Sequence, residues 1–250
     1  DVYKRQTNGM SIEITSDKKG GSYIEITRHM MEQFGVATTF DGTSYEVSNT
    51  SHYIVGDYAI EPDMSAACYF YAMATLTGGT ITVKGVESDL IQGDINFLNV
   101  LKMLGSQITP TAQGIQVTGP KDGIYEGITV DMNNFSDQTM TLAALAPFAT
   151  SPITIQNVAH IRVQECDRMQ AIINELTKAG ITCQSDGEQI HIIPGQIKPS
   201  SISTYEDHRM AMAFTLLGLK TEGILIEDPT CTKKTFENYF EVLEDLLANN

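Results

Sequence analysis

Three short segments concentrate the side chains that could move protons or bind an anion. Residues 162–168 place two guanidinium groups and two carboxylates within seven positions. Residues 205–213 place an acid and an Arg at the start of an apolar run, and residues 228–236 carry two adjacent Lys. Five of the nine Lys and Arg after position 120 lie in these segments. Carboxylates act as acids and bases and cations bind phosphate, so the segments predict one site for a small anion.

Arg168 is the residue whose position most favours a ligand. The apolar periodicity that follows it predicts a helix that Asp167 caps and that Gly180 ends. A helix N-terminus carries partial positive charge, so an Arg in its first turn is unfavourable unless an anion lies nearby. We therefore interpret Arg168 as placed for a ligand. The alternative is an exposed Arg168 that pairs with Glu165 or Asp167, an arrangement that is common and weak.

The elements that must position these residues follow a threefold repeat after residue 60. An acid opens an Ala- and Met-rich helix at Asp63, Asp137 and Asp207, with spacings of 74 and 70 residues. Each helix leads to a short β-branched strand and then to a second helix. The strands are predicted at 80–83, 153–155 and 224–226, and the second helices near Asp94, Asp167 and Thr235.

Hairpins close the first two repeats, at 107–117 and 181–193, so each repeat reads βαβαββ, with the third cut short by the C-terminus. Three such units can bury their helices around one axis with the sheets outside. The helix N-termini would then gather at one end, where their dipoles favour anions. The predicted fold class is α/β with repeated βαβαββ units.

Composition excludes several classes of protein. The 250 residues are 42% apolar, with a net charge of -15 and a sequence pI near 4.6. This acidic balance argues against nucleic-acid binding. We find neither a long apolar run nor a signal peptide, so we expect no membrane span. The four cysteines form no C-x-x-C pair, which indicates reduced thiols in a cytoplasmic protein and no zinc site.

The N-terminal part reads as a separate region. Residues 1–6 have no initiator Met and resemble a non-native tag. A strand at 12–15, a helix at 23–34 and a hairpin around Asp41-Gly42 make about one α/β unit. The pattern restarts near residue 60. We therefore expect a partial N-terminal-half domain at 1–60 and a C-terminal-half domain of three units at 61–250.

Taken together, these motifs resemble the 5-enolpyruvylshikimate-3-phosphate (EPSP) synthase family. The resemblance runs from about Met10 to Phe240, and the string Asp-His-Arg-Met-Ala-Met at 207–212 is its most specific part. The sister family that transfers enolpyruvate to UDP-N-acetylglucosamine shares the fold but not that string. The segments that carry the resemblance are 23–27, 92–94, 131–137, 162–168, 207–212 and 228–236.

The resemblance implies two domains of three βαβαββ units each, an inside-out α/β barrel arrangement called the enolpyruvate transferase fold. It implies transfer of the enolpyruvyl group of phosphoenolpyruvate to the 5-hydroxyl of shikimate 3-phosphate, with release of phosphate. Both substrates are small anions, and no metal or organic cofactor is implied. We expect a cytoplasmic enzyme that is a monomer when full length.

The resemblance also implies residue roles. Asp137 would take the proton of the attacking hydroxyl, and Glu165 would handle proton transfer at the methylene carbon. Lys234 would bind phosphoenolpyruvate and donate a proton. Asp137 has the alternative role of a helix cap, and Asp207 is interpreted as a cap. The residues implied to bind substrate are Tyr23, His160, Gln164, Arg168, Arg209 and Lys234.

Three departures accompany the resemblance. The family usually has Lys where this chain has Gln164 and Asn where it has His160, and a Ser near Tyr23 is replaced by Gly20. Most of the family's N-terminal part, with further substrate contacts, is absent, so we expect little or no activity from this chain alone. Two alternatives stay open: a UDP-N-acetylglucosamine enolpyruvyl transferase, or an inactive fragment that binds a phosphorylated ligand.

Overall fold

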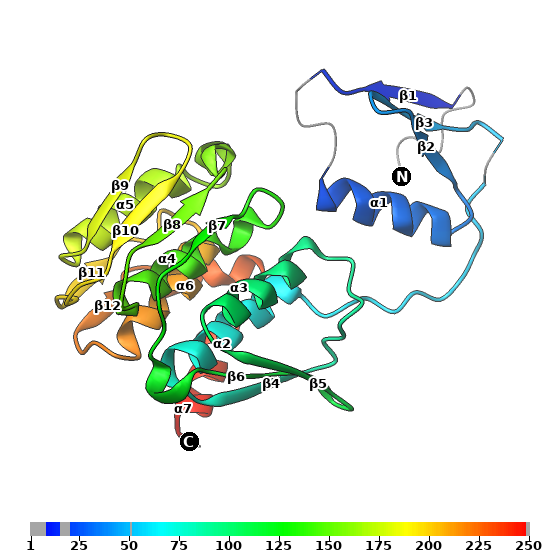
Figure 1. Cartoon of the computed structure of the whole chain (residues 1–250). Coiled ribbons are helices and arrows are strands. Elements are labelled where there is room, and N and C mark those ends of the chain that lie inside the picture. Colours follow the sequence, from blue (N-terminus) through cyan, green and yellow to red (C-terminus); the bar gives the residue numbers. More distant parts are fainter. Residues whose placement is uncertain (1–8, 16–20, 51, 249–250) are drawn as a thin grey trace. The chain divides into compact units, whose positions relative to one another are not determined.

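The chain divides into two compact units in the computed structural model, which describes residues 9–15, 21–50 and 52–248 (Figure 1). The first unit is Asp1–Glu61 with Asp89–Gly93, and the second is Pro62–Ser88 with Asp94–Asn250. The tag-like residues 1–6 and Gly20 lie outside the described residues. Among the helices that are described, none has the length and apolarity needed to cross a bilayer.

The first unit pairs one helix with a three-stranded antiparallel sheet, ordered β1-β3-β2. Its elements are β1 (Met10–Glu13), α1 (Ser22–Gln33), β2 (Thr38–Phe40) and β3 (Ser44–Val47). The Asp41 carboxylate accepts hydrogen bonds from the backbone N–H groups of Thr43 and Ser44, which forms the predicted hairpin turn. The predicted strand at 12–15 is shifted: β1 begins at Met10 and ends at Glu13, because Glu13 already pairs with Ser44 beside that turn.

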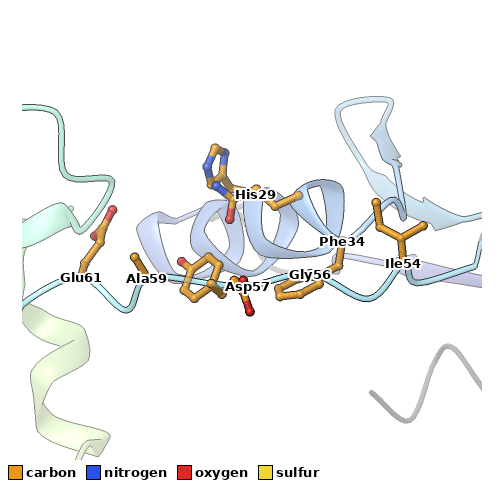
Figure 2. A pocket seen from close by; sticks show the side chains of 9 residues that line it. His29, Phe34, Ile54, Gly56, Asp57, Ala59 and Glu61 are labelled. Atoms are coloured by element: carbon orange, nitrogen blue, oxygen red, sulfur yellow. The ribbon is translucent and has the colours of Figure 1, made fainter.

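A pocket opens between α1 and the extended residues 54–61 of the same unit (Figure 2). His29 and Phe34 line it from the helix side, and Asp57 and Glu61 line it from the extended segment. Tyr23, the predicted site residue of this unit, is not one of the lining residues. Its side chain is 65% exposed and lines a separate groove between α1 and the sheet.

Three helices form the interior of the second unit and contact one another: α2 (Met64–Thr77), α4 (Thr139–Leu145) and α6 (His208–Gly218). Their Ala- and Met-rich sequences are apolar on almost every side, which is typical of a helix without a solvent face. The helix α2 begins at Asp63, whose carboxylate accepts from the N–H groups of Ser65 and Ala66. It ends at Gly78, which has the left-handed backbone conformation, φ 74°.

A sheet accompanies each repeat outside these helices, in the orders β4-β6-β5, β7-β8-β10-β9 and β11-β12. Figure 1 shows the first two of these sheets on different sides of α2, α4 and α6. The strands are β4 (Thr80–Lys84), β5 (Gln107–Thr111), β6 (Gly114–Thr118), β7 (Thr129–Asp131), β8 (Ile153–Gln156), β9 (Thr182–Ser185), β10 (Ile190–Ile193), β11 (Ser200–Ile202) and β12 (Ile224–Ile226). The remaining helices are α3 (Phe97–Met103), α5 (Arg168–Lys178) and α7 (Tyr239–Ala248).

The repeats confirm the predicted α/β class but differ from one another in completeness. The second repeat runs β7-α4-β8-α5-β9-β10, the full βαβαββ pattern. In the first repeat, the described residues 52–63 before α2 form no strand. In the third, a 3₁₀ helix (Pro229–Lys234) precedes α7, which therefore begins at Tyr239 rather than near Thr235. A 3₁₀ turn also leads into α4, so Asp137 lies before that helix and does not cap it.

Candidate active site

The N-terminal ends of several helices of the second unit meet, as the repeat predicts. Gln138, which precedes α4, donates from Nε2 to the Asp94 carboxylate (2.8 Å) and to the backbone carbonyl of Ser65 (3.5 Å) at the start of α2. The Ser65 hydroxyl donates to the same Asp94 carboxylate. The carboxylates of Asp167 and Asp207 cap α5 and α6 by accepting backbone N–H bonds. Positive helix ends therefore surround this region of the unit.

Arg168, in the first turn of α5, is the centre of the site and is only 1% exposed. Its Nε and Nη2 donate to the two oxygens of Asp207 at 2.7 and 3.3 Å. Its Nη1 donates to Asp137 at 3.0 Å and to the amide oxygen of Gln164. Its Nη2 also donates to Glu165 at 3.2 Å. These five hydrogen bonds match the five N–H donors of a guanidinium group.

The expected alternative, an exposed Arg168 in a weak surface pair, is wrong. Burial lowers the pKa of Arg168, but the hydrogen bond and charge of Asp207 and the charge of Asp137 raise it by more. Glu165 is one of its partners, whereas Asp167 pairs with Arg162 at 3.0 Å. The anions that offset the positive end of α5 are therefore carboxylates of the chain itself.

Asp137 lies between two guanidinium groups. Its Oδ1 accepts from Arg168 at 3.0 Å, and its Oδ2 pairs with Nη2 of Arg209 at 2.9 Å. The side chain is 13% exposed. Two charged contacts fix the orientation of this carboxylate more firmly than neutral hydrogen bonds would. The alternative of Asp137 as only a helix cap does not hold, since α4 is preceded by Gln138 at its cap position.

Glu165 and Lys234 form an ion pair at the more exposed side of the site, with side chains 33% and 56% exposed. The hydrogen bond from Lys234, with the charges of Arg168 and Lys234, lowers the pKa of Glu165 to about 2, although partial burial opposes this. Glu165 is therefore an ionised carboxylate near neutral pH. The ammonium group of Lys234 donates to this carboxylate.

The other residues predicted to bind substrate, His160, Gln164 and Tyr23, differ in what they contact. His160 Nε2 is 2.8 Å from the hydroxyl of Ser136, the residue next to Asp137. Gln164 accepts from Arg168, so the site uses this amide as an acceptor. The structure brings these two residues together with Asp137, Glu165, Arg168, Arg209 and Lys234. Tyr23 belongs to the first unit and is not placed relative to them.

Sequence reasoning missed the role of Asp207 beyond its cap. This carboxylate is fully buried and accepts from Arg168, from the backbone N–H of Arg209 and, at 3.6 Å, from the Cys166 thiol. Its neighbour His208 is buried, and burial followed by the charge of Arg209 lowers the pKa of its imidazole. The sequence feature that could have indicated this role is an acid directly before a His-Arg pair at the start of an apolar helix.

The three cations Arg168, Arg209 and Lys234 are matched by the three carboxylates Asp137, Glu165 and Asp207. An anionic ligand must therefore compete with these carboxylates for their cations. Among the described residues, no group of three or more His, Cys, Asp and Glu side chains could hold a metal ion. All four cysteines, each within the described part, are free thiols.

Comparison with solved structures identifies the fold as that of the enolpyruvyl transferases. EPSP synthase from Acinetobacter baumannii matches 98% of this chain and 58% of its own, with a TM-score of 0.79 and 20% identity. The enolpyruvyl transferase NikO from Streptomyces tendae matches 98% of this chain and 57% of its own, with a TM-score of 0.69 and 15% identity. At these identities the likeness concerns the fold alone.

The particular family follows from sequence. Residues 4–243 match the profile of EPSP synthase (3-phosphoshikimate 1-carboxyvinyltransferase), and the chain belongs to this family. A 3-phosphoshikimate 1-carboxyvinyltransferase from Nostoc punctiforme is 47% identical over 88% of this chain and 51% of its own length. The chloroplastic enzyme of Brassica napus is 39% identical over 95% of this chain and 48% of its own length. The chain thus spans about half the length of these curated relatives.

Proposed function

We propose that this chain supplies the proton-transfer residues and part of the anion site of a 3-phosphoshikimate 1-carboxyvinyltransferase. That enzyme transfers the enolpyruvyl group of phosphoenolpyruvate to the 5-hydroxyl of shikimate 3-phosphate and releases phosphate. The observation that carries the proposal is the connected cluster in which Asp137 and Glu165 share Arg168 and each holds a second cation. The proposed enzyme acts in the cytoplasm as a monomer.

Asp137 is the proposed base for the attacking hydroxyl. Arg168 and Arg209 each hold one of its oxygens, which fixes the plane of the carboxylate. A carboxylate oxygen can accept more than one hydrogen bond, so the hydroxyl can donate to Asp137 beside its guanidinium partners. Transfer of the hydroxyl proton to Asp137 leaves the oxygen able to attack the enol carbon.

Lys234 is the proposed acid for the methylene carbon. Because the pKa of Glu165 is lowered to about 2, its carboxylate has no proton to give near neutral pH. The ammonium of Lys234 has one, and Glu165 holds that ammonium in place. The hydroxyl oxygen bonds to the enol carbon as Lys234 gives this proton to the methylene carbon. The Lys234 amine then takes a proton back from the resulting methyl group while the bond to phosphate breaks, which restores the double bond and the ammonium.

Phosphoenolpyruvate binding requires a rearrangement of the ion pairs. All five N–H donors of Arg168 are engaged, so it can contact the ligand only after Glu165 or Gln164 releases one of them. Lys234 is the most exposed cation of the cluster and has Glu165 as its carboxylate partner. We therefore expect the ligand to bind Lys234 first and to displace Glu165 from it.

The test joins this chain to the part of the Nostoc punctiforme relative that precedes the matched region and measures phosphate release. Turnover on the order of 10 per second is expected with both substrates present. Asp137→Ala should lower kcat about 100- to 10,000-fold, as loss of a general base does, while shikimate 3-phosphate still binds. Glu188→Ala, which removes an exposed carboxylate between β9 and β10 of the same repeat, is the matched control and should keep full rate.

Other outcomes would contradict the proposal. Turnover with UDP-N-acetylglucosamine in place of shikimate 3-phosphate would favour the sister transferase. Binding of a phosphorylated ligand without turnover would favour an inactive binding fragment. The chain by itself should show little or no turnover, because orientation of both reactants can supply roughly 7–11 kcal/mol of a barrier and the chain spans only about half of the curated relatives' length.

A further inference from the structure

The loop between β11 and α6 contains two consecutive residues in a conformation that side chains disfavour. Tyr205 and Glu206 have φ angles of 57° and 59°, the left-handed region. Non-glycine residues visit this region singly and uncommonly, and they keep it only where the surrounding structure imposes it. The next residue is Asp207, the buried partner of Arg168. The turn therefore determines where this carboxylate lies.

Glu175, on the third turn of α5, accepts hydrogen bonds from the loop on both sides of Thr204. Its side chain is 1% exposed, although it carries a carboxylate. Its Oε2 accepts from the backbone N–H of Ser203 at 3.0 Å, and its Oε1 accepts from the hydroxyl of Tyr205 at 2.8 Å. Both bonds are made to the loop, one on each oxygen. Lys178, one turn further along α5, pairs with Oε2 at 2.6 Å.

Neighbours of Glu175 strengthen the same connection. The amide of Asn174 donates to the Tyr205 hydroxyl at 3.2 Å, and Lys178 Nζ donates to the backbone carbonyl of Ser201 at 2.8 Å. Within the loop, the N–H of Asp207 donates to the carbonyl of Thr204 at 2.9 Å. One face of α5 thus holds the end of β11 and the loop up to Tyr205. The first residue of α5, Arg168, holds Asp207 at the end of that loop.

We propose that Glu175 is a positioning residue for the active site. It holds the strained turn, the turn places Asp207, and Asp207 orients the Arg168 guanidinium that contacts Asp137 and Glu165. Its importance for catalysis rests on the proposed function, but its action on Arg168 does not. A buried carboxylate needs partners to remain in a protein interior, and Glu175 meets that need entirely with the loop and Lys178.

The test follows the Nε–H proton of Arg168 in this chain by NMR, with no substrate present. That proton is donated to the fully buried Asp207 and should exchange slowly with water. Glu175→Gln replaces one acceptor oxygen, and Tyr205→Phe removes the hydroxyl that donates to Glu175 and accepts from Asn174. Each should speed Arg168 Nε–H exchange about tenfold or more, because hydrogen bonds to a charged group are the strong ones.

Glu227→Gln is the matched control. Glu227 has an exposed carboxylate that accepts from the hydroxyls of Ser201 and Ser203, so this carboxylate contacts the same segment through serine side chains and not through its backbone N–H groups. It should leave the Arg168 exchange rate unchanged. The Nε–H of Arg162, in its exposed pair, and the backbone amides of α2 should be unaffected in all three variants.

Two outcomes would overturn the proposal. The first is an Arg168 Nε–H exchange rate that is the same in Tyr205→Phe as in Glu227→Gln, which would mean that the loop holds Asp207 without Glu175. This comparison can be made even if Glu175→Gln does not fold. The second is an equal rise in the exchange rates of the Arg168 Nε–H and of the α2 backbone amides, which would mean that Glu175 only stabilises the fold. Failure of turnover in the joined enzyme would contradict the proposed function and would leave the exchange result unchanged.

Discussion

Asp207 and Asp94 are both buried carboxylates at helix N-terminal ends of the second unit, but they accept hydrogen bonds from different kinds of donor. Asp207 accepts from the guanidinium of Arg168, whereas Asp94 accepts from the hydroxyl of Ser65 and the amide of Gln138. Burial raises the pKa of Asp94, and its neutral donors offset this only in part. We call the bonds of Asp207 and Arg168 the charged network and the bonds of Asp94 the neutral network. The charged network contains ion pairs that an anionic ligand can exchange, and the neutral network connects helices.

The comparison predicts that the charged network is the more costly one to break. Arg168→Met keeps much of the volume but leaves Asp207 buried without its cation, and removing one partner of a buried pair typically costs about 3–5 kcal/mol. Urea unfolding of this chain measures the loss. Arg162→Met is the matched control, because its pair with Asp167 is exposed and should contribute less than about 1 kcal/mol. Equal losses would contradict the comparison.

The neutral network should be easier to alter. Asp94→Asn keeps the shape and one acceptor oxygen while removing a buried charge, so we expect a loss of about 1 kcal/mol or less near pH 4. The pKa of Asp94 is raised in the folded chain, so the native state holds its proton more tightly than the unfolded state. This residue's contribution to the free energy of unfolding therefore falls as pH rises above 3.8 toward the raised value.

Asn does not ionise, so Asp94→Asn removes this decrease in the free energy of unfolding with rising pH. The variant should therefore gain stability relative to the parent chain between about pH 4 and neutral pH. Urea midpoints at several pH values give this difference directly. If the variant instead becomes less stable than the parent chain as pH rises, Asp94 is stabilised as the ion.

Glu165 should show the opposite slope and a smaller effect. Its pKa is lowered from 4.5 to about 2, so its pairing contributes stability above pH 4.5 that is lost as pH falls toward 2. Glu165→Gln should flatten the acid side of the stability profile. The effect is small because solvent screens a pair that is a third to a half exposed. If the free energy of unfolding falls equally steeply with falling pH in the parent chain and in Glu165→Gln, the pairing with Lys234 is contradicted.

The sequence predicts local features of this site better than its long-range contacts. The caps at Asp63, Asp167 and Asp207 follow from an acid before an apolar run, and all three are present. The main partner of Arg168 is Asp207, 39 residues away, and this pairing depends on how α5 and α6 both pack against α4. Local spacing gave a ligand as the main interpretation of Arg168 and an exposed pair with Glu165 or Asp167 as the alternative. The burial of Arg168 contradicts only that alternative.

Gln164 shows the same limit. Sequence reasoning interprets it as a missing cation, but the structure gives its amide oxygen to Arg168, a role that a Lys could not fill. The opening strand of the first repeat was also expected from the repeat pattern. The described residues before α2 instead run as an extended segment in the first unit, where Ile54 bonds to Phe34 through the backbone.

The most direct test of the exchangeable ion pairs is the pKa of the Glu165 carboxyl group in this chain, measured by carbon NMR with and without phosphoenolpyruvate. Without ligand, the hydrogen bond from Lys234 should hold the pKa at about 2. When the ligand takes Lys234, the pKa should rise toward its ordinary 4.5. An unchanged, lowered pKa at ligand concentrations where calorimetry detects binding would contradict the account, because Lys234 would then have stayed with Glu165.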